Sequence, residues 1–409
     1  MKRIVLLIGL FLAISCGLRE IGGMEENDGV WWGPGRHVVT GSAAPEGKKS
    51  IWYAVGVDYP YDYDWLEGKD QGPVKCSLKV FANGVPLMKV PVGDVYEISS
   101  DPDMHRMIDG DLYTDYSTQT ETVVRKNGSI LFRYDAREMM LDMMVVEHDV
   151  YTLGQSRSGE GFSFRKNGEV LFSKSSGYAF PGSLHHGVQM CFAFCEPIVG
   201  EQGNVERYFV YRGGNVSQVA LREDVRKVWD IIVSDDQVSY IASLVGVTAP
   251  VLSMGDNIRI LELPSHSTPL QFNFISNQEG IGFGPEPGIE GMLSKDGNIC
   301  FCALWRGSKL AATFPDGYMS ASSCDVEGET FCVLNGSRAD NEGIIYYAGE
   351  QTVVPKGYCV SAGGQTLAVV NGLLYVGLTS KHGENASVWV EDEMKPLKIN
   401  GFISHISGD

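Results

Sequence analysis

Several features that mark other classes of protein are missing from this chain of 409 residues. Beyond its first residues, no segment repeats apolar side chains with a helical period, and none reaches roughly 18 uninterrupted apolar residues. The cysteines form no CxxC pair, and there is no GxSxG, HExxH or Walker motif. These absences argue against a helical bundle and against the enzyme families that those motifs define.

Positive charge is also scarce. The chain has 33 Lys and Arg against 51 Asp and Glu, which gives a formal net charge of −18. Such a surface repels phosphate backbones, so we expect no nucleic-acid binding. The charge suits a soluble exported protein, or one that binds neutral or cationic ligands.

The first residues have the pattern of an export signal. Lys2 and Arg3 precede an apolar run over residues 4–14, and Ser15-Cys16 follows at once. Residues 12–16 (LAISC) resemble the lipobox of bacterial lipoproteins, in which the cysteine becomes the lipid-modified first residue; ordinary signal-peptidase cleavage after Ser15 is the alternative. We expect a signal peptide at 1–15, a lipid on Cys16 that anchors the protein to the membrane, and a tether and arm at 16–50.

What is present is a repeated hairpin with a tight turn. Residues 124–132 (VRKNGSILF) closely match residues 164–172 (FRKNGEVLF). Asn-Gly supplies two adjacent residues that tolerate positive φ, as a type I′ turn requires. Weaker copies bring the turns to eight, at residues 84, 128, 168, 214, 255, 307, 349 and 392. Their spacing of 40 to 52 residues is the size of one four-stranded propeller blade.

An aromatic residue in a strand-like setting precedes most of these hairpins, as at Tyr113, Tyr151 and Tyr240. Each unit therefore predicts four strands, A to D, of which C and D are joined by the tight turn. The predicted fold class is all-β: a single β-propeller over residues 51–409 with seven to eight four-stranded blades. Eight blades are favoured, although strands A and B of the sixth unit have no clear place in residues 271–296.

The two well-matched hairpins also carry a resemblance. The chain resembles the β-propeller lipoproteins of Gram-negative bacteria whose blades carry an aromatic-x-Lys-Asn-Gly turn, over roughly residues 50 to 409. That family is mostly of unknown function. The resemblance implies a fold and a periplasmic, outer-membrane or cell-surface address, but no catalytic residues.

The C-terminal residues 402–409 have the pattern of a strand A and follow a complete eighth unit. We expect them to close the ring by serving as strand A of the first blade, beside residues 51–55, because an open ring would expose two unpaired edges. Residues 37–40 (HVVT) are the competing candidate for that place.

The face formed by the B–C and D–A connections is the predicted ligand face. The longest irregular segments, residues 59–73 and 175–187, belong to these connections, and variable loops on a rigid scaffold usually carry function. The first segment interleaves aromatic rings, which stack on sugars or cations, with carboxylates. Its predicted ligand-binding residues are Tyr59, Tyr61, Asp62, Tyr63, Asp64 and Trp65. The alternative is an ordered loop whose rings pack on the first blade.

His185 and His186, in or near a D–A connection, complete the predicted ligand-binding set. Adjacent histidines on a strand point to opposite faces and are poorly placed to share one ion, so we predict no metal site, and no cofactor. His148 and His405 fall at similar places in their A strands and are candidates for lining the central channel.

Cys324 and Cys332 flank the expected A–B turn at Gly328. A three-residue loop would set them face to face, as a disulfide or as neighbouring free thiols.

These observations favour a non-catalytic binding module for a glycan, a peptide or an envelope protein. The alternative is a propeller-type glycan hydrolase or lyase, which would need two carboxylates facing one bond. Paired carboxylates such as Asp62/Asp64 and Asp101/Asp103 are the only candidates, and most such pairs sit beside turns, where Asp is expected anyway.

Overall fold

The computed structural model describes residues 51–59, 76–91, 105–117, 120–135, 138–157, 161–200, 203–234, 237–275, 286–295, 299–326, 328–336, 342–347, 349–361, 365–380, 385–390 and 392–408. Every regular element in these ranges is a β-strand. Within them, no helix is long and apolar enough to cross a membrane.

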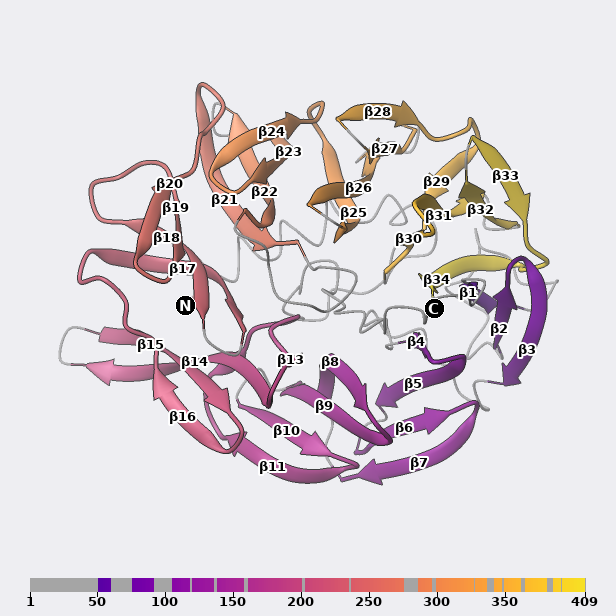
Figure 1. Ribbon diagram of the computed structural model, residues 1–409, viewed down its shortest axis with the longest axis horizontal. Coiled ribbons are helices and arrows are strands. Elements are labelled where there is room, and N and C mark those ends of the chain that lie inside the picture. The colour runs from indigo at the N-terminus through magenta and orange to yellow at the C-terminus, as the bar shows by residue number, and fades with distance from the viewer. Residues whose placement is uncertain are drawn as a thin grey trace.

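The strands form eight antiparallel sheets arranged in a ring (Figure 1). Each sheet is one blade, with strand A at the inside of the ring and strand D at its rim. Blade one contains β34 (Gly401–Gly408), β1 (Trp52–Asp58), β2 (Ser77–Ala82) and β3 (Val85–Pro91). Blade two contains β4 (His105–Ile108), β5 (Asp111–Ser117), β6 (Thr122–Lys126) and β7 (Ser129–Tyr134). Blade three contains β8 (Glu138–Val146), β9 (Asp149–Ser156), β10 (Phe162–Lys166) and β11 (Glu169–Lys174).

In blades four and eight the innermost strand is split into two short segments. Blade four contains β12 (Tyr178–Ala179) and β13 (His185–His186), then β14 (Met190–Gly200), β15 (Gly203–Arg212) and β16 (Asn215–Gln218). Blade eight contains β29 (Tyr358–Val360) and β30 (Leu367–Val370), then β31 (Leu373–Ser380), β32 (Ala386–Val390) and β33 (Glu393–Pro396).

The remaining three blades follow the simple four-strand order. Blade five contains β17 (Val225–Val233), β18 (Val238–Leu244), β19 (Val251–Met254) and β20 (Asn257–Ile260). Blade six contains β21 (Ser267–Phe274), β22 (Gly288–Lys295), β23 (Ile299–Arg306) and β24 (Lys309–Thr313). Blade seven contains β25 (Tyr318–Val326), β26 (Glu329–Gly336), β27 (Ile344–Tyr347) and β28 (Glu350–Val353). The prediction of eight blades is confirmed, and β21 and β22 are the two strands that the sequence left unplaced.

All eight predicted turns join strands C and D. Each of the eight turn positions has a positive φ, from 55° at Gly307 to 95° at Gly214. In the best-matched copies the asparagine also ties the turn to strand B: the Asn127 side-chain oxygen accepts a hydrogen bond from the Leu112 amide at 2.8 Å, and Asn167 accepts one from Val150 at 2.9 Å. The repeated turn that dominates the sequence therefore has a structural role: it joins strands C and D and, in these copies, fixes them to strand B.

Ring closure follows the prediction. β34 pairs antiparallel with β1, so Val57 lies opposite Phe402 and Trp52 opposite Gly408. The last strand of the chain is therefore strand A of the blade that the first described strand begins. The competing residues 37–40 lie outside the described part of the chain.

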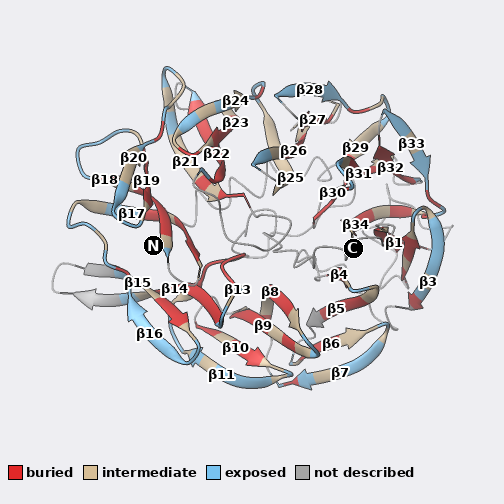
Figure 2. Cartoon of the chain, in the orientation of Figure 1, coloured by how far each residue is buried: buried red, intermediate tan, exposed pale blue. Residues whose placement is uncertain are grey.

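The core lies between neighbouring blades. Phe272 and Trp305 of blade six, for example, pack with Ile232 and Leu252 of blade five. Figure 2 shows buried residues along the inner strands and exposed residues along the outermost strands β3, β7 and β11. Each blade is thus stabilised mainly by burying its two faces against its neighbours.

One predicted register is wrong. Cys324 lies opposite Phe331, and Cys332 lies opposite Ser323, because two residues rather than three separate Val326 from Glu329 in the turn. The shift by one residue places the two cysteines on opposite faces of the sheet. Both are free thiols.

Candidate functional site

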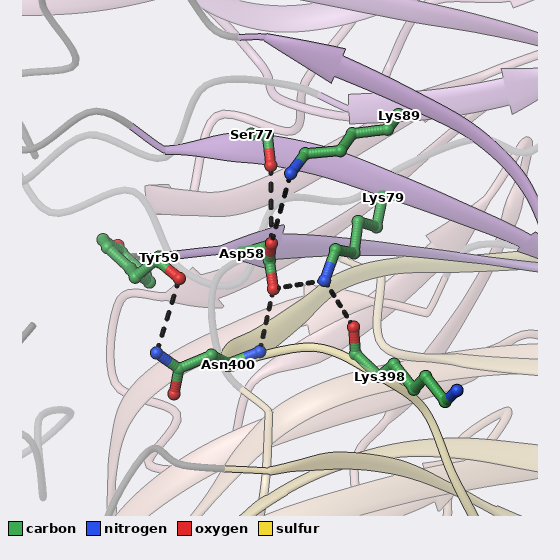
Figure 3. A network of polar contacts seen from close by, with 7 residues as sticks. All are labelled: Asp58, Tyr59, Ser77, Lys79, Lys89, Lys398 and Asn400. Atoms are coloured by element: carbon green, nitrogen blue, oxygen red, sulfur yellow. Dashed lines mark hydrogen bonds and ion pairs between the residues drawn. The ribbon is translucent and has the colours of Figure 1, made fainter. Parts of the chain in front are cut away.

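Asp58, Lys79, Lys398 and Asn400 form a network of polar contacts, here called the Asp58 clamp (Figure 3). It lies at the base of the predicted aromatic loop, residues 59–73. Asp58 is the last residue of β1, and its register partner Ser77 is the first residue of β2, so the chain leaves and re-enters the sheet at this pair. One carboxylate oxygen of Asp58 accepts hydrogen bonds from Lys79 Nζ at 2.8 Å and from the backbone amide of Asn400 at 2.9 Å. Lys79 Nζ also donates to the carbonyl of Lys398 at 2.6 Å. The clamp therefore joins the loop base to the segment that enters the innermost strand β34.

Tyr59 is the one predicted loop residue within the described ranges. Its ring is buried among the side chains of blade one, and its centroid lies 6.4 Å from that of Phe402. Its amide donates to the carbonyl of Asn400 at 2.8 Å. The first residue of the loop is thus anchored by packing. Tyr61, Asp62, Tyr63, Asp64 and Trp65 lie outside the described residues, so their contact with a ligand stays a prediction.

The predicted histidines occupy separate places. His185 and His186 follow the D–A connection and form β13, opposite Cys191 and Met190 at the start of β14. They therefore lie at the A–B end of the innermost strand, away from the predicted ligand face. His185 is partly buried and His186 exposed, as alternation along a strand requires. Their role as ligand-binding residues stays a prediction.

His148 and His405 do not share an environment. His148 is exposed in the turn between β8 and β9, whereas His405 is buried in the middle of β34. Of these two histidines, only His405 belongs to an innermost strand, so the prediction that both occupy similar places in their A strands is wrong.

A group of buried polar residues on three innermost strands was not predicted from the sequence. This inner polar cluster consists of His405 and Ser404 of β34, His105 and Arg106 of β4, and Asp142 of β8. Nδ1 of His105 lies 2.9 Å from the Ser404 hydroxyl, and Nη2 of Arg106 donates to Asp142 at 2.8 Å. Nη1 of Arg106 donates to the carbonyl of Met143. The cluster thus connects blades one, two and three.

Burial sets the protonation of the inner polar cluster. It lowers the pKa of His105 to about 4 and, helped by Arg106 and His105, that of His405 to about 3. Burial also raises the pKa of Asp142 to about 6, although the Arg106 guanidinium acts in the opposite direction. At neutral pH both imidazoles are therefore uncharged, and Arg106 is the only cation of the cluster.

A sequence feature could have pointed to part of this cluster. Asp142 interrupts an otherwise apolar run, and an aspartate within a buried strand needs a partner. The innermost strand bulges beside it, since the register shifts between Met140 and Asp142. A matching bulge precedes Asp230 in β17, where the carboxylate accepts hydrogen bonds from its own neighbour Ile231 and from Phe274 of the next blade, at 2.9 and 2.7 Å. A buried aspartate after a bulge is thus a link between blades.

Three other carboxylates, Glu138 and Glu290 (buried) and Asp325 (half-buried), are also held by hydrogen bonds or ion pairs. Glu138 pairs with Arg165 at 2.9 Å, Glu290 accepts from the Ser320 and Ser323 hydroxyls, and Asp325 pairs with Arg306 through both oxygens. Within the described ranges, no three side chains of the metal-binding types gather closely enough to hold an ion. These contacts join strands of one blade, as in Glu138–Arg165, or of neighbouring blades, as in Asp325–Arg306.

Comparison with known proteins gives the fold alone. No family model matches the sequence, and no curated protein does. Among solved structures, the dihydro-heme d1 dehydrogenase NirN in complex with DHE aligns with a TM-score of 0.50 at 7% identity, covering 91% of this chain and 78% of that one. Apo AztD from Citrobacter koseri aligns at 0.49 and 10% identity, covering 88% and 98%. BamB from Moraxella catarrhalis aligns at 0.40 and 11% identity, covering 78% and 91%.

Proposed function

We propose that this chain is an exported, lipid-anchored propeller that binds a glycan, a peptide or a partner protein at the cell envelope without catalysing a reaction. The ligand contacts the face formed by the B–C and D–A connections. The observation that carries the proposal is the Asp58 clamp, which fixes both sides of the aromatic loop base and ties it to the entry of β34.

A fixed base favours binding for an energetic reason. A loop whose two ends are fixed before its ligand arrives loses less conformational entropy on binding than a loop whose ends are free. Because the ring of Tyr59 is already packed on Phe402, the ligand is contacted by Tyr61, Tyr63 and Trp65. Their flat rings can stack on sugar faces or on cationic side chains. Asp62 and Asp64 between them supply hydrogen-bond acceptors for hydroxyl or ammonium groups.

The test is a glycan-array and peptide-library screen with the wild-type protein, followed by the triple variant Tyr61→Ala, Tyr63→Ala, Trp65→Ala. The variant should lose binding while its melting temperature falls by no more than a few degrees. Tyr347→Ala is the matched control, because Tyr347 is an exposed ring on β27. Unchanged binding together with a large loss of stability in the triple variant would show that the rings only pack on the blade.

Lipidation is proposed from the charged start, the apolar run and Ser15-Cys16. Mass spectrometry of the membrane fraction should find an acylated N-terminal Cys16, and Cys16→Ser should release the protein into the soluble fraction. An unmodified Cys16 on a freely soluble protein would contradict the anchor and leave the ligand proposal standing.

A further inference from the structure

His405 is a buried histidine whose ring has no hydrogen-bond partner among the described residues. Its exposed fraction is 1%, and neither Nδ1 nor Nε2 is within hydrogen-bonding reach of another group in that part of the chain. The Ser407 hydroxyl on the same strand is likewise buried and unpartnered there. Leaving such groups unpaired costs free energy, so this strand is held less firmly than its apolar contacts suggest.

The charged groups that act on His405 all oppose its protonation. Five strands pack against β34, namely β1, β4, β30, β31 and β32. The charges that act on His405 come from His105 and Arg106, both on β4, and both oppose its protonation. Asp142, the carboxylate of the inner polar cluster, is already bound to Arg106. Asp58 lies opposite Gly401 at the far end of β34, where it holds Lys79 and Asn400.

We propose that β34 is a latch that acid releases. Protonation of His405 drives this C-terminal strand away from β1, from β4 of blade two and from blade eight, and the ring opens at blade one. An imidazolium at this position is buried, faces Arg106 and gains no counter-ion from the described residues. The free-energy cost of this buried charge falls only when the imidazolium reaches water. Because β34 supplies strand A of blade one, its departure frees the inner edge of β1 and uncovers the face of blade eight on which Ile403 and Ile406 pack.

The direction of the pH dependence follows from the folded-state values. His405 and His105 have folded pKa values below the usual 6.5, so the open state binds protons first, and closure weakens as pH falls below about 6.5. Asp142 has a raised folded pKa and acts in the opposite sense, favouring the closed state as pH falls through about 6. A comparison with and without the His405 imidazole cancels the contributions of both Asp142 and His105.

The experiment is hydrogen exchange of the full chain, read by mass spectrometry on peptides from β34, with intrinsic exchange rates corrected for pH. Between pH 7 and pH 4.5, the protection of the β34 amides in the wild type should fall on the order of 100-fold. One histidine with an open-state pKa of about 6.5 can shift the opening equilibrium by about this factor at pH 4.5, two units lower. Strands β18 and β22, on the far side of the ring, should change much less.

Two histidine variants decide the assignment. His405→Gln should lose at least about tenfold less β34 protection than the wild type between pH 7 and pH 4.5, because only His105 and Asp142 then change their protonation on opening. His148→Gln, which removes an exposed imidazole, should behave as the wild type. Equal loss in wild type and His405→Gln, or simultaneous loss in all blades, would overturn the latch.

A measurement on the wild type covers the case in which His405→Gln fails to fold. Deuterium exchange at the imidazole C2 reports the titration of each histidine. Exchange at His405 should be slow and should titrate with the opening of β34, whereas exchange at the exposed His148 should be faster. A fast, independent titration of His405 would also overturn the proposal.

Discussion

The carboxylate of Asp58 accepts a hydrogen bond from the backbone amide of Asn400, 342 residues further along the chain, at 2.9 Å. This contact joins the first described strand to the residues that lead into the last one. It belongs to a blade that is built from both ends of the propeller, β34 on the inside and β1 to β3 outside it. The stability of the ring therefore depends on contacts that no local segment can make.

Deletion of residues 401–409 should cause aggregation or a cooperative loss of stability. The deletion removes strand A of blade one, including Ile403 and Ile406, which are fully buried against blade eight, and it exposes the edge of β1. Urea unfolding and size-exclusion chromatography measure the effect. The milder variant Ile406→Ala should cost about 2–5 kcal/mol. A truncated protein that stays monomeric with an unchanged melting point would disprove closure by this strand.

Asp58→Asn should weaken the clamp. The variant loses the ion pair with Lys79 at 2.8 Å and converts a charge-assisted hydrogen bond from Asn400 into a neutral one. Since this side chain is largely buried, we expect a loss of about 1.5–3 kcal/mol in urea unfolding.

The matched control for Asp58→Asn is Asp224→Asn. Asp224 pairs with Arg222 at 2.7 Å, but both side chains are exposed, so the variant should show no measurable change. Equal effects in the two variants would mean that the clamp contributes nothing particular to ring closure.

Gly128→Ala should be more harmful than Gly214→Ala. Both glycines have positive φ, 83° and 95°, so each alanine is strained by about 1–2 kcal/mol. A Cβ at Gly128 would also come within 2.7 Å of Val90 on the preceding blade, whereas nothing lies within 4 Å at Gly214. Urea midpoints should separate the two variants. Identical losses would show that the turn of blade two does not need close contact with blade one.

The eight described cysteines should react with a thiol reagent slowly in the native protein and completely in urea. Cys300 and Cys359, which are partly exposed, should react first. Burial raises the pKa of the Cys302, Cys324 and Cys332 thiols and keeps them unreactive. A disulfide between Cys324 and Cys332 in a peptide map would contradict the observed register.

The sequence alone predicted the features that depend on neighbouring residues. Asn127-Gly128 can adopt two successive positive φ values, so the turns of blades two and three could be placed from their residues, and the other turns from weaker copies at a similar spacing. The spacing of these turns indicated eight units, and the alternation in residues 402–409 identified the closing strand. Strands β21 and β22 escaped prediction because a long connection, residues 275–287, replaces the short A–B turn that the other units led us to expect.

The tertiary structure alone decided which polar side chains meet. Arg106, Asp142 and His405 come from three blades, and nothing in the local pattern of β4, β8 or β34 indicates that they share one buried cluster. Their meeting depends on ring closure and on bulges that turn individual side chains within the innermost strands. Turn conformation and strand alternation are local properties of the chain, whereas desolvation and charge pairing arise only when distant strands exclude water together.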